Sequence, residues 1–328
     1  MAASRKKIVV SLTVPADLRE QLQNEFDLIN LPVGGNIDDV VPAADRAGVH
    51  GLLGTLRLKV DDALLARYPG VEVVSNYAVG FDNIDVDAAT KRKVLVCNTP
   101  QVLDKAVADL TLGLVLCTMR DMIRGDAHVR AGKWTKGALP LSTDLAGKTL
   151  GLLGMGRIGR MVAARAKAFD MNVVYHNRRK DDEAERSGLA RWVEREALFR
   201  QSDVVSVHVP LSDETAQCVG ARELGWMKPS AFLINTARGK VLDENALVEC
   251  LRERKIAGAG LDVMTVEPIG ADHPLCQLDN VVLQPHVASG TVETRRAMMD
   301  LAVENLILGL RGERPRALVN ADLWPRKA

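Results

Sequence analysis

The stretch TLGLLGMGRIGRMVAARAKAF, residues 149–169, decides the fold of the second half of the chain. A short apolar run leads into glycines with the spacing G-x-G-x-x-G, and an alanine-rich segment with helical periodicity follows. In a strand–turn–helix of this kind the glycines permit a tight turn and a close approach to a pyrophosphate, and the first helical amides face the phosphates. A tight turn without a ligand is the alternative, which the flanking strand and helix patterns disfavour. The residues predicted to hold a dinucleotide here are Gly154, Met155, Gly156, Arg157, Ile158 and Gly159.

The next apolar run ends in VVYHNRRK, residues 173–180, and this ending bears on the kind of dinucleotide. An Asp or Glu about 20 residues after the glycine turn would bind the ribose hydroxyls of NAD and repel a 2′-phosphate. The chain has Asn177, Arg178 and Arg179 there instead. Guanidinium groups match phosphate oxygens in geometry and charge, so we predict NADPH/NADP as the preferred cofactor and NADH as the weaker one. The alternative is that both arginines are merely solvated at a strand end.

Parallel βα units account for most of the chain. Apolar runs rich in Val, Ile and Leu alternate with segments of helical charge spacing, which indicates parallel sheets covered by helices on both faces. We therefore predict an α/β fold with two doubly wound parallel-sheet domains. The expected strands are residues 7–12, 26–31, 49–56, 71–77 and 94–100 in the first domain, and 149–156, 172–177, 203–210, 231–237, 257–263 and 280–287 in the second.

Two long helical patterns set the domain boundaries. Residues 101–134 read as one long helix that joins the domains and is a candidate contact with a partner subunit. Residues 291–312 read as a last helix, which we expect to pack back on the first domain and so make that domain discontinuous. The predicted domains are residues 1–99 with 290–328 for the substrate, and residues 100–289 for NADP(H).

Three further strand ends carry side chains suited to acid–base chemistry. They contribute Arg238, Asp262, Glu267 and His286, and ligands of open α/β sheets bind beyond the carboxyl ends of the strands. Arg238 can bind carboxylate or carbonyl oxygens, His286 can donate a proton, and Glu267 can hold the other ring nitrogen. Asp262 either binds the carboxamide of the cofactor or caps a turn. Taken singly, each residue could be a surface charge or a cap; together they predict a reductase of 2-oxo acids.

The chain resembles the D-2-hydroxyacid dehydrogenases over nearly its whole length, and within them the glyoxylate and hydroxypyruvate reductases. The motifs that carry the resemblance are NYAVGFDNIDVDAA (76–89), LLGMGRIG (152–159), INTARG (234–239), GLDVMTVEP (260–268) and LQPHVASGTVETR (283–295). The resemblance implies a flavodoxin-like substrate domain and a Rossmann coenzyme domain with a cleft between them. It also implies a homodimer paired through the coenzyme domains, with the loop around Trp134 in the contact, and hinges at Thr99–Pro100 and residues 287–289.

The same resemblance assigns roles to individual residues. Arg238, Glu267 and His286 are implied as the catalytic set, and the amides of Val79 and Gly80 as ligands of the substrate carboxylate. We further expect Leu53, Gly54, Thr55 and Trp134 near the substrate. The substrate-binding residues are then Leu53, Val79, Gly80, Arg238 and His286. Besides the glycine turn and residues 177–179, the cofactor-binding residues are His208, Val209, Pro210, Thr215, Thr236, Ala237, Arg238, Asp262, His286, Ser289 and Gly290.

Composition narrows the remaining possibilities. A net charge of +1 without a block of like charge indicates neither a nucleic-acid nor a membrane surface, and the five scattered cysteines suggest free thiols in a reducing compartment. We expect a cytoplasmic protein without a metal site. Two other functions stay open: an NAD-linked dehydrogenase of another D-2-hydroxy acid, and a dinucleotide-sensing protein of the corepressor type, which shares this fold.

Overall fold

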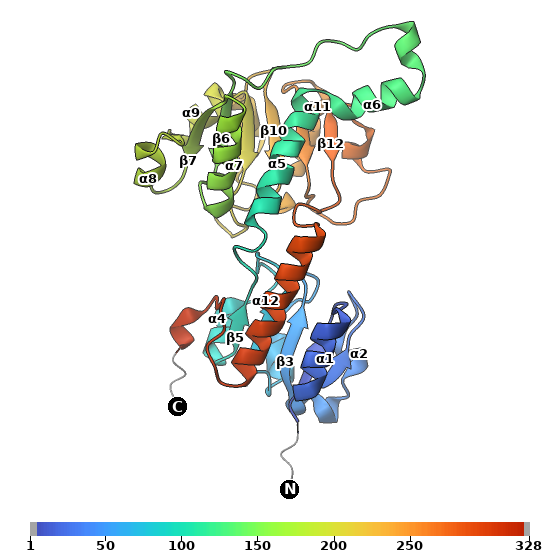
Figure 1. Ribbon diagram of the computed structural model, residues 1–328, viewed down its shortest axis with the longest axis vertical. Coiled ribbons are helices and arrows are strands. Elements are labelled where there is room, and N and C mark those ends of the chain that lie inside the picture. The colour runs from blue at the N-terminus through green and yellow to red at the C-terminus, as the bar shows by residue number, and fades with distance from the viewer. Residues whose placement is uncertain (1–4, 325–328) are drawn as a thin grey trace. The chain divides into compact units, whose positions relative to one another are not determined.

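The computed structural model describes residues 5–324 and divides into two compact units. One unit comprises Met1–Leu103 and Val292–Ala328, and the other comprises Asp104–Thr291. These boundaries differ by only a few residues from those expected from the sequence. Each unit has its own parallel sheet and its own apolar clusters (Figure 1).

The first unit is built on a five-stranded parallel sheet in the order β2-β1-β3-β4-β5, which is the flavodoxin-like order. Residues 37–48 form a short helix and a 3₁₀ turn, which are separated at Pro42, a residue that lacks an amide hydrogen. The strands are β1 (Lys7–Val10), β2 (Asp27–Asn30), β3 (Val49–Gly54), β4 (Val73–Asn76) and β5 (Leu95–Cys97). The helices are α1 (Ala16–Glu25), α2 (Ile37–Val40), η1 (Ala43–Gly48), α3 (Asp62–Arg67), α4 (Val86–Lys91), α12 (Val292–Leu310) and η5 (Ala321–Leu323).

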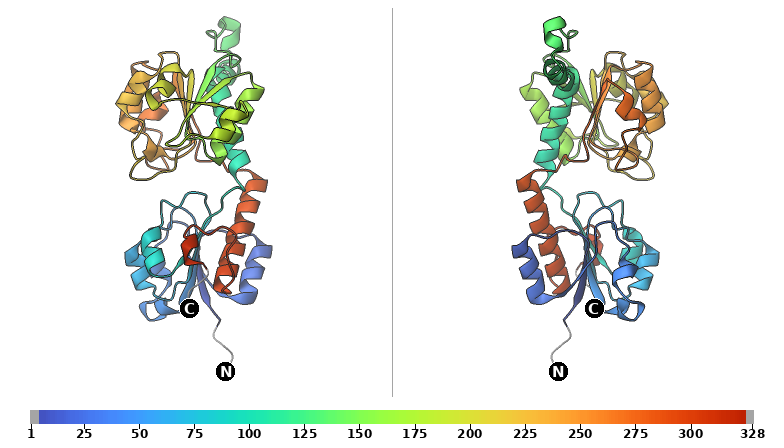
Figure 2. Two further views of the ribbon diagram at one scale, coloured as in Figure 1. Left: turned by 90° about the vertical axis from the view of Figure 1, so that its left-hand side faces the viewer. Right: turned by 90° about the vertical axis from the view of Figure 1, so that its right-hand side faces the viewer.

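Helices cover both faces of this sheet (Figure 2). Helices α1 and α12 pack on one face around Leu22, Leu53 and Leu306, and the other face is covered by α2, α3 and α4. Asp61 and Asp85 begin α3 and α4 by accepting hydrogen bonds from the amides three residues on. The expectation that the last helix packs on the first domain is therefore confirmed, since α12 contacts β3, β4 and β5.

The second unit has a seven-stranded parallel sheet in the order β12-β11-β10-β9-β6-β7-β8. When the strands are numbered from the start of this unit, their order is the Rossmann order with one further strand at an edge. Six of the seven strands were predicted from the sequence, and the two-residue β8 was not. The strands are β6 (Thr149–Leu153), β7 (Asn172–His176), β8 (Arg191–Trp192), β9 (Val204–Val207), β10 (Phe232–Asn235), β11 (Gly258–Leu261) and β12 (Val281–Leu283). The helices are α5 (Asp104–Met119), α6 (Met122–Arg130), η2 (Lys133–Lys136), α7 (Arg157–Ala168), α8 (Asp182–Arg186), α9 (Arg195–Gln201), α10 (Ala221–Trp226), η3 (Gly239–Val241), α11 (Glu244–Arg252) and η4 (Pro274–Gln277).

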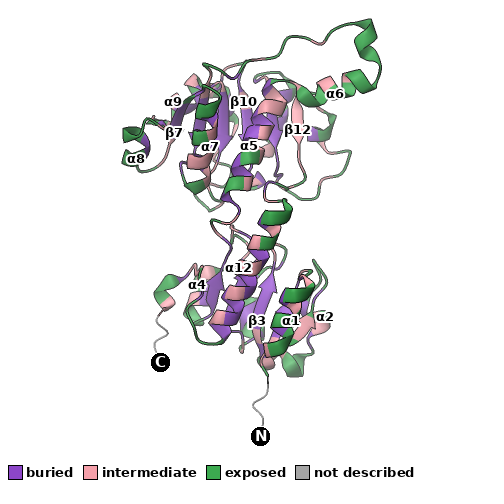
Figure 3. Cartoon of the chain, in the orientation of Figure 1, coloured by how far each residue is buried: buried purple, intermediate pink, exposed green. Residues whose placement is uncertain are grey.

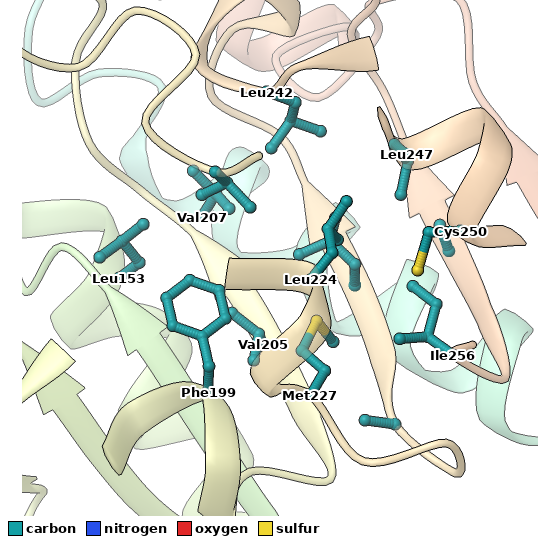
Figure 4. Close-up of a cluster of buried hydrophobic side chains, with 14 of the residues drawn as sticks. Leu153, Phe199, Val205, Val207, Leu224, Met227, Leu242, Leu247, Cys250 and Ile256 are labelled. Carbon is teal, nitrogen blue, oxygen red and sulfur yellow. The ribbon is translucent and has the colours of Figure 1, made fainter. Parts of the chain in front are cut away.

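Two apolar clusters hold this second sheet between its helices. Helices α5 and α7 pack on one face around Leu150 and Leu152. On the other face Phe199, Val205 and Leu224 belong to the cluster under α9, α10 and α11 (Figure 4). Strands buried on both faces explain why the sequence runs of this sheet are continuously apolar rather than alternating. The prediction of two doubly wound parallel-sheet units is confirmed.

The predicted single helix over residues 101–134 is wrong. Helix α5 ends at Met119, and Asp121 adopts a left-handed backbone conformation with φ 53°, which breaks the helical path before α6. No residue of α6 or η2 is buried, and Figure 3 shows α6 largely in the colour of exposed residues. This segment keeps helical periodicity in the sequence although it lies outside the core.

Candidate functional site

The glycine turn follows β6, whose neighbours in the sheet are β7 and β9. Gly154 has φ +103°, and a Cβ atom there would lie 2.7 Å from the carbonyl carbon and oxygen of His208. A Cβ atom at Gly159 would lie 2.5 Å from the oxygen of Gly154. Both positions therefore require glycine, the first because of its backbone conformation and its neighbour, the second because helix α7 starts so close to the turn.

The turn has the features of a phosphate cradle. A Cβ atom at Gly156 would meet no atom of residues 5–324 within 4 Å, so the absence of a side chain there serves no packing within the described part of the chain. Helix α7 begins without a side-chain cap, which leaves its first amides for an anion. Arg157, the first residue of α7, is held through Nε by the buried carboxylate of Asp104 at 2.9 Å. These groups fit the pyrophosphate of a dinucleotide.

The end of β7 is bound to the glycine turn. The side-chain oxygen of Asn177 accepts a hydrogen bond from the Met155 amide at 2.7 Å, and the Asn177 carbonyl accepts one from the Trp192 indole at 3.1 Å. Asn177 thus fixes the geometry of the turn. Arg178 and Arg179 are exposed, and the Arg178 guanidinium pairs with Glu214 at 2.6 Å.

The loop after β9 lies on the other side of the glycine turn. His208 donates its amide hydrogen to the Leu153 carbonyl at 2.8 Å, and its Nε2 lies 2.8 Å from the Ser206 hydroxyl. His208 keeps partial exposure as a residue, but burial of the imidazole lowers its pKa to about 4, so it is neutral at pH 7. The Thr215 hydroxyl donates to the Pro210 carbonyl at 2.6 Å and accepts from the Ser212 amide at 2.8 Å. The loop that carries Val209 and Pro210 is therefore a hydrogen-bonded turn.

Strand β10 delivers Arg238 through a loop that the fold constrains tightly. The buried side chain of Asn235 bonds the amide of Ala237 at 3.0 Å and the carbonyl of Arg238 at 2.9 Å. Thr236 shares a 2.9 Å hydrogen bond with Thr111 of α5. A Cβ atom at Gly239 would lie 1.9 Å from the backbone of Met264, so the loops after β10 and β11 are in direct contact.

Glu267 and His286 form a hydrogen-bonded pair. Oε2 of Glu267 lies 2.6 Å from Nδ1 of His286, and Oε1 accepts from the Met264 amide at 3.0 Å. Burial opposes ionisation of Glu267, but its hydrogen bonds and the charges of His286 and Arg238 outweigh burial and lower its pKa. Glu267 is thus an anion at neutral pH that can orient the imidazole and stabilise its protonated form.

Asp262 holds the backbone around His286. Its two carboxylate oxygens accept from the amides of Val287 and Ala288 at 2.8 and 2.9 Å, and its carbonyl accepts from the His286 amide at 2.8 Å. His286 itself has φ 55°, a left-handed conformation that is costly for a residue other than glycine. Asp262 is fully buried, and burial raises its pKa. Of the two roles considered from the sequence, the geometry matches the turn cap.

In the first unit, the loop after β4 presents two backbone amides. The Val79 carbonyl accepts from the Asn98 side chain at 2.7 Å, and the Gly80 carbonyl accepts from the Asn76 side chain at 2.8 Å. Within residues 5–324 no hydrogen bond uses the amide hydrogens of Val79 or Gly80, which leaves them free for an anion. Leu53, in contrast, is fully buried in the core of this unit; we therefore correct the expectation that its side chain lines a substrate pocket.

Other predicted residues lie at the edges of these loops. Ser289 and Gly290 follow His286, and the Gly290 amide donates to the Val287 carbonyl at 2.7 Å. Thr55 accepts from the Arg57 amide in a turn after β3. Trp134 on η2 is 70% exposed, so within its own unit it lines no pocket.

Several residues that build these loops were not singled out from the sequence. Asn76, Asn98, Asp104 and Glu214 act through partners that lie from 4 to 53 residues away along the chain, so spacing alone could not pair them. Glu244, which accepts from the Thr265 amide at 2.9 Å, is a further example. Asn76 and Asn98 stand at strand ends, and that position was the available signal for these two residues.

Within residues 5–324 no three His, Cys, Asp or Glu side chains are grouped as metal ligands would be. In the same part of the chain, no helix has both the length and the apolarity that a bilayer span requires.

Comparison with known proteins gives consistent matches. Residues 112–288 match the model of the D-isomer specific 2-hydroxyacid dehydrogenase NAD binding domain. The chain is 46% identical to a glyoxylate reductase of Thermococcus litoralis over 84% of its length and 85% of the relative's. It is 42% identical to a glyoxylate/hydroxypyruvate reductase B of an Enterobacter species, covering 96% of this chain and 98% of that one.

A solved structure agrees with these sequence matches. The NADPH-dependent glyoxylate/hydroxypyruvate reductase from Sinorhizobium meliloti, in complex with NADP and malonate, is similar with a TM-score of 0.89 and 35% identity. The similarity covers 99% of this chain and 100% of that one. The chain therefore belongs to the D-isomer specific 2-hydroxyacid dehydrogenase family.

Proposed function

We propose that this protein reduces glyoxylate and hydroxypyruvate to 2-hydroxy acids, with NADPH as the preferred reductant and the D configuration where a stereocentre forms. One observation carries the proposal: the Glu267–His286 pair, at 2.6 Å, lies on the loops that follow β11 and β12, and Arg238 follows the adjacent β10. The names of the Thermococcus, Enterobacter and Sinorhizobium relatives support the same substrates.

Each side chain of the candidate site has its own role in the proposed reaction. The nicotinamide, when bound, supplies the hydride. His286, with Nδ1 bonded to Glu267, donates the proton on Nε2 to the keto oxygen of the substrate. Arg238 binds oxygens of the substrate and stabilises the negative charge that develops there, and the amides of Val79 and Gly80 bind its carboxylate. In the reverse direction neutral His286 removes the hydroxyl proton.

The cofactor preference rests on the loop after β7. The glycine turn fits the pyrophosphate, and Arg178 and Arg179 supply two guanidinium groups for a 2′-phosphate. Steady-state rates with glyoxylate and hydroxypyruvate, each with NADPH and with NADH, test both parts of the proposal. Faster turnover with NADPH is expected. Faster turnover with NADH would support the proposed reaction and refute the proposed preference for NADPH.

Replacing the proton donor tests the chemistry. His286→Ala is expected to lower kcat by at least a hundredfold, because general acid–base catalysis typically contributes 10²–10⁴-fold, while the Kd of NADPH stays within a few-fold. His128→Ala is the matched control, since that histidine lies partly exposed on α6 and its Nε2 bonds the Gly137 carbonyl. Retention of kcat in His286→Ala would refute the role of His286.

Replacing the two arginines tests the cofactor. Arg178→Ala/Arg179→Ala is expected to weaken NADPH binding at least tenfold and NADH binding less than threefold, because a phosphate dianion loses two charge-assisted contacts. Arg186→Ala on α8, which is also exposed, removes a positive charge nearby and should change neither Kd. Equal losses for both cofactors would show that these arginines do not read the 2′-phosphate.

The protein is further proposed to be a cytoplasmic homodimer that pairs through the second unit. Support comes from apolar side chains exposed over α6 and the segment after it: Met122, Ile123, Val129, Trp134 and Leu141. Large apolar side chains gathered on one exposed segment are typical of protein interfaces. Ile123→Glu/Val129→Glu should then yield a monomer in sedimentation equilibrium that keeps the far-UV circular dichroism spectrum of the folded protein. A wild-type monomer at micromolar concentration would refute the assignment.

A further inference from the structure

The ion pair between Arg178 and Glu214 joins two loops on opposite sides of the glycine turn. Arg178 follows β7 and Glu214 follows β9, while β6, which ends in the glycine turn, lies between these strands in the sheet. The Arg178 Nη1 and Glu214 Oε2 atoms are 2.6 Å apart. The pair therefore spans the strand end from which the glycine turn leaves the sheet.

Both loops are fixed to the sheet, whereas the two paired side chains reach into solvent. On one side, Asn177 is bonded to Met155 and Trp192; on the other, the Thr215 hydroxyl closes the turn that carries Glu214. The side chains of Arg178 and Glu214 are 87% and 72% exposed. Separation of the pair thus needs only side-chain rotation.

We propose that Glu214 is a specificity-determining residue, which competes with the 2′-phosphate of NADP(H) for the Arg178 guanidinium and so limits the preference over NAD(H). This inference rests on the proposed function, in which Arg178 binds the 2′-phosphate. A carboxylate and a phosphate both bind a guanidinium through its in-plane N–H donors and in the same geometry. A 2′-phosphate that binds the Nη1 donor of Arg178 therefore replaces the Glu214 contact, and Glu214 also repels the phosphate charge. NADH binding requires neither.

The size of the effect follows from exposure. Ion pairs between exposed side chains contribute little free energy, and the corresponding factor in an equilibrium constant is about fivefold at most. Glu214 therefore reduces the preference for NADPH by a few-fold. Since exposed charges are screened by salt, the effect should shrink as ionic strength rises.

The same loop offers a matched control. Asp213 precedes Glu214, is exposed, and has no ion-pair partner within residues 5–324. Asp213→Asn removes the same charge from the same turn without breaking the contact with Arg178. This variant shows how much NADPH affinity changes when the loop loses a negative charge, and so isolates the specific competition that we propose for Glu214.

The test is equilibrium binding of NADPH and NADH, followed by calorimetry or tryptophan fluorescence, to the full-length wild type, Glu214→Gln, Asp213→Asn, Arg178→Ala and Arg178→Ala/Glu214→Gln. Glu214→Gln should bind NADPH about two- to fivefold more tightly and NADH unchanged. Asp213→Asn should give a clearly smaller gain, and Glu214→Gln should give none when Arg178 is absent. Melting temperatures should agree within about 1 °C, because the pair is exposed.

The outcomes separate this inference from the proposed function. If Arg178→Ala selectively weakens NADPH but Glu214→Gln leaves both cofactors unchanged, the competition is refuted and the proposed cofactor preference stands. If Asp213→Asn and Glu214→Gln strengthen NADPH binding equally, the negative charge of the loop as a whole limits the preference, and the specific pair with Arg178 is refuted. If Arg178→Ala weakens neither cofactor selectively, the reading of the 2′-phosphate fails, and the role of Glu214 fails with it.

Discussion

Replacing Asp262 with asparagine should impair catalysis without impairing cofactor binding. The wild-type carboxylate accepts from the amides of Val287 and Ala288 at 2.8 and 2.9 Å and so holds His286 at φ 55°. Asparagine keeps one acceptor and turns an NH₂ group toward the other amide. The change therefore removes about one hydrogen bond to a charged group, about 1.5–3 kcal/mol.

That loss is comparable with the cost of the left-handed conformation of His286, about 1–2 kcal/mol. The loop can then relax and carry the imidazole away from its working position. If the whole loss appears in the transition state, kcat falls by about 10- to 100-fold, at 1.36 kcal/mol for each factor of ten. The free energy of unfolding should change less, because burial raises the pKa of Asp262 and neutral asparagine avoids the burial of a charge.

The assay is kcat with glyoxylate and NADPH, together with the Kd of NADPH and the melting temperature. Asp203→Asn is the matched control: Asp203 also accepts a backbone amide, from Thr149 at 2.9 Å, but at the start of β6, where no catalytic loop lies. It should lower stability and leave kcat unchanged. A kcat of Asp262→Asn within twofold of wild type would refute the positioning role. A rise in the Kd of NADPH with kcat unchanged would instead support a contact between Asp262 and the carboxamide of the cofactor.

Three further changes follow from the geometry. Glu267→Gln should be less stable than wild type at neutral pH, and this difference in the free energy of unfolding should shrink as pH falls below 4.5. The pKa of Glu267 is lowered in the folded protein, so the ionised carboxylate stabilises the wild type above that pH and its contribution disappears in acid. Thermal melts from pH 3 to 7 measure the difference, and a constant value would contradict the prediction. Gly239→Ala should lower the free energy of unfolding by more than about 3 kcal/mol or prevent folding, because its Cβ would lie 1.9 Å from the Met264 backbone. Denaturant unfolding measures the loss, and Gly225→Ala is the control, because a Cβ there meets no atom of residues 5–324 within 4 Å. Gly154→Ala should weaken NADPH and NADH alike by at least tenfold, since φ +103° and the His208 backbone exclude a side chain; unchanged Kd values would disprove this.

The fold was largely predictable because its signals are local. Continuous apolar runs marked the strands, and the glycines after β6 marked the turn. The break at Asp121 was not predictable, because the helical spacing of the sequence continues through it while the backbone adopts φ 53°. The ion pair of Asp121 with Arg124 does not indicate the break either, because its i,i+3 spacing is also that of a continuous helix.

The candidate site was predictable in its residue types more than in its connections. Arg238, Glu267 and His286 stand out because each follows a strand end. The roles of Asp262 and Glu214 depend on partners 25 and 36 residues away, respectively. Such contacts arise from the order of strands in the sheet, which residue spacing does not reveal. Leu53 was misjudged for the same reason, since its burial depends on α12 at the other end of the chain.

The position of α12 has a consequence for synthesis. Met299, Val303 and Leu306 of this helix supply part of the core of a unit whose strands all precede residue 98. During translation, residues 104–291 emerge in between and form a unit of their own. The second unit can therefore fold on the ribosome while the first still exposes the apolar face that α12 will cover, so the N-terminal sheet reaches its native packing last.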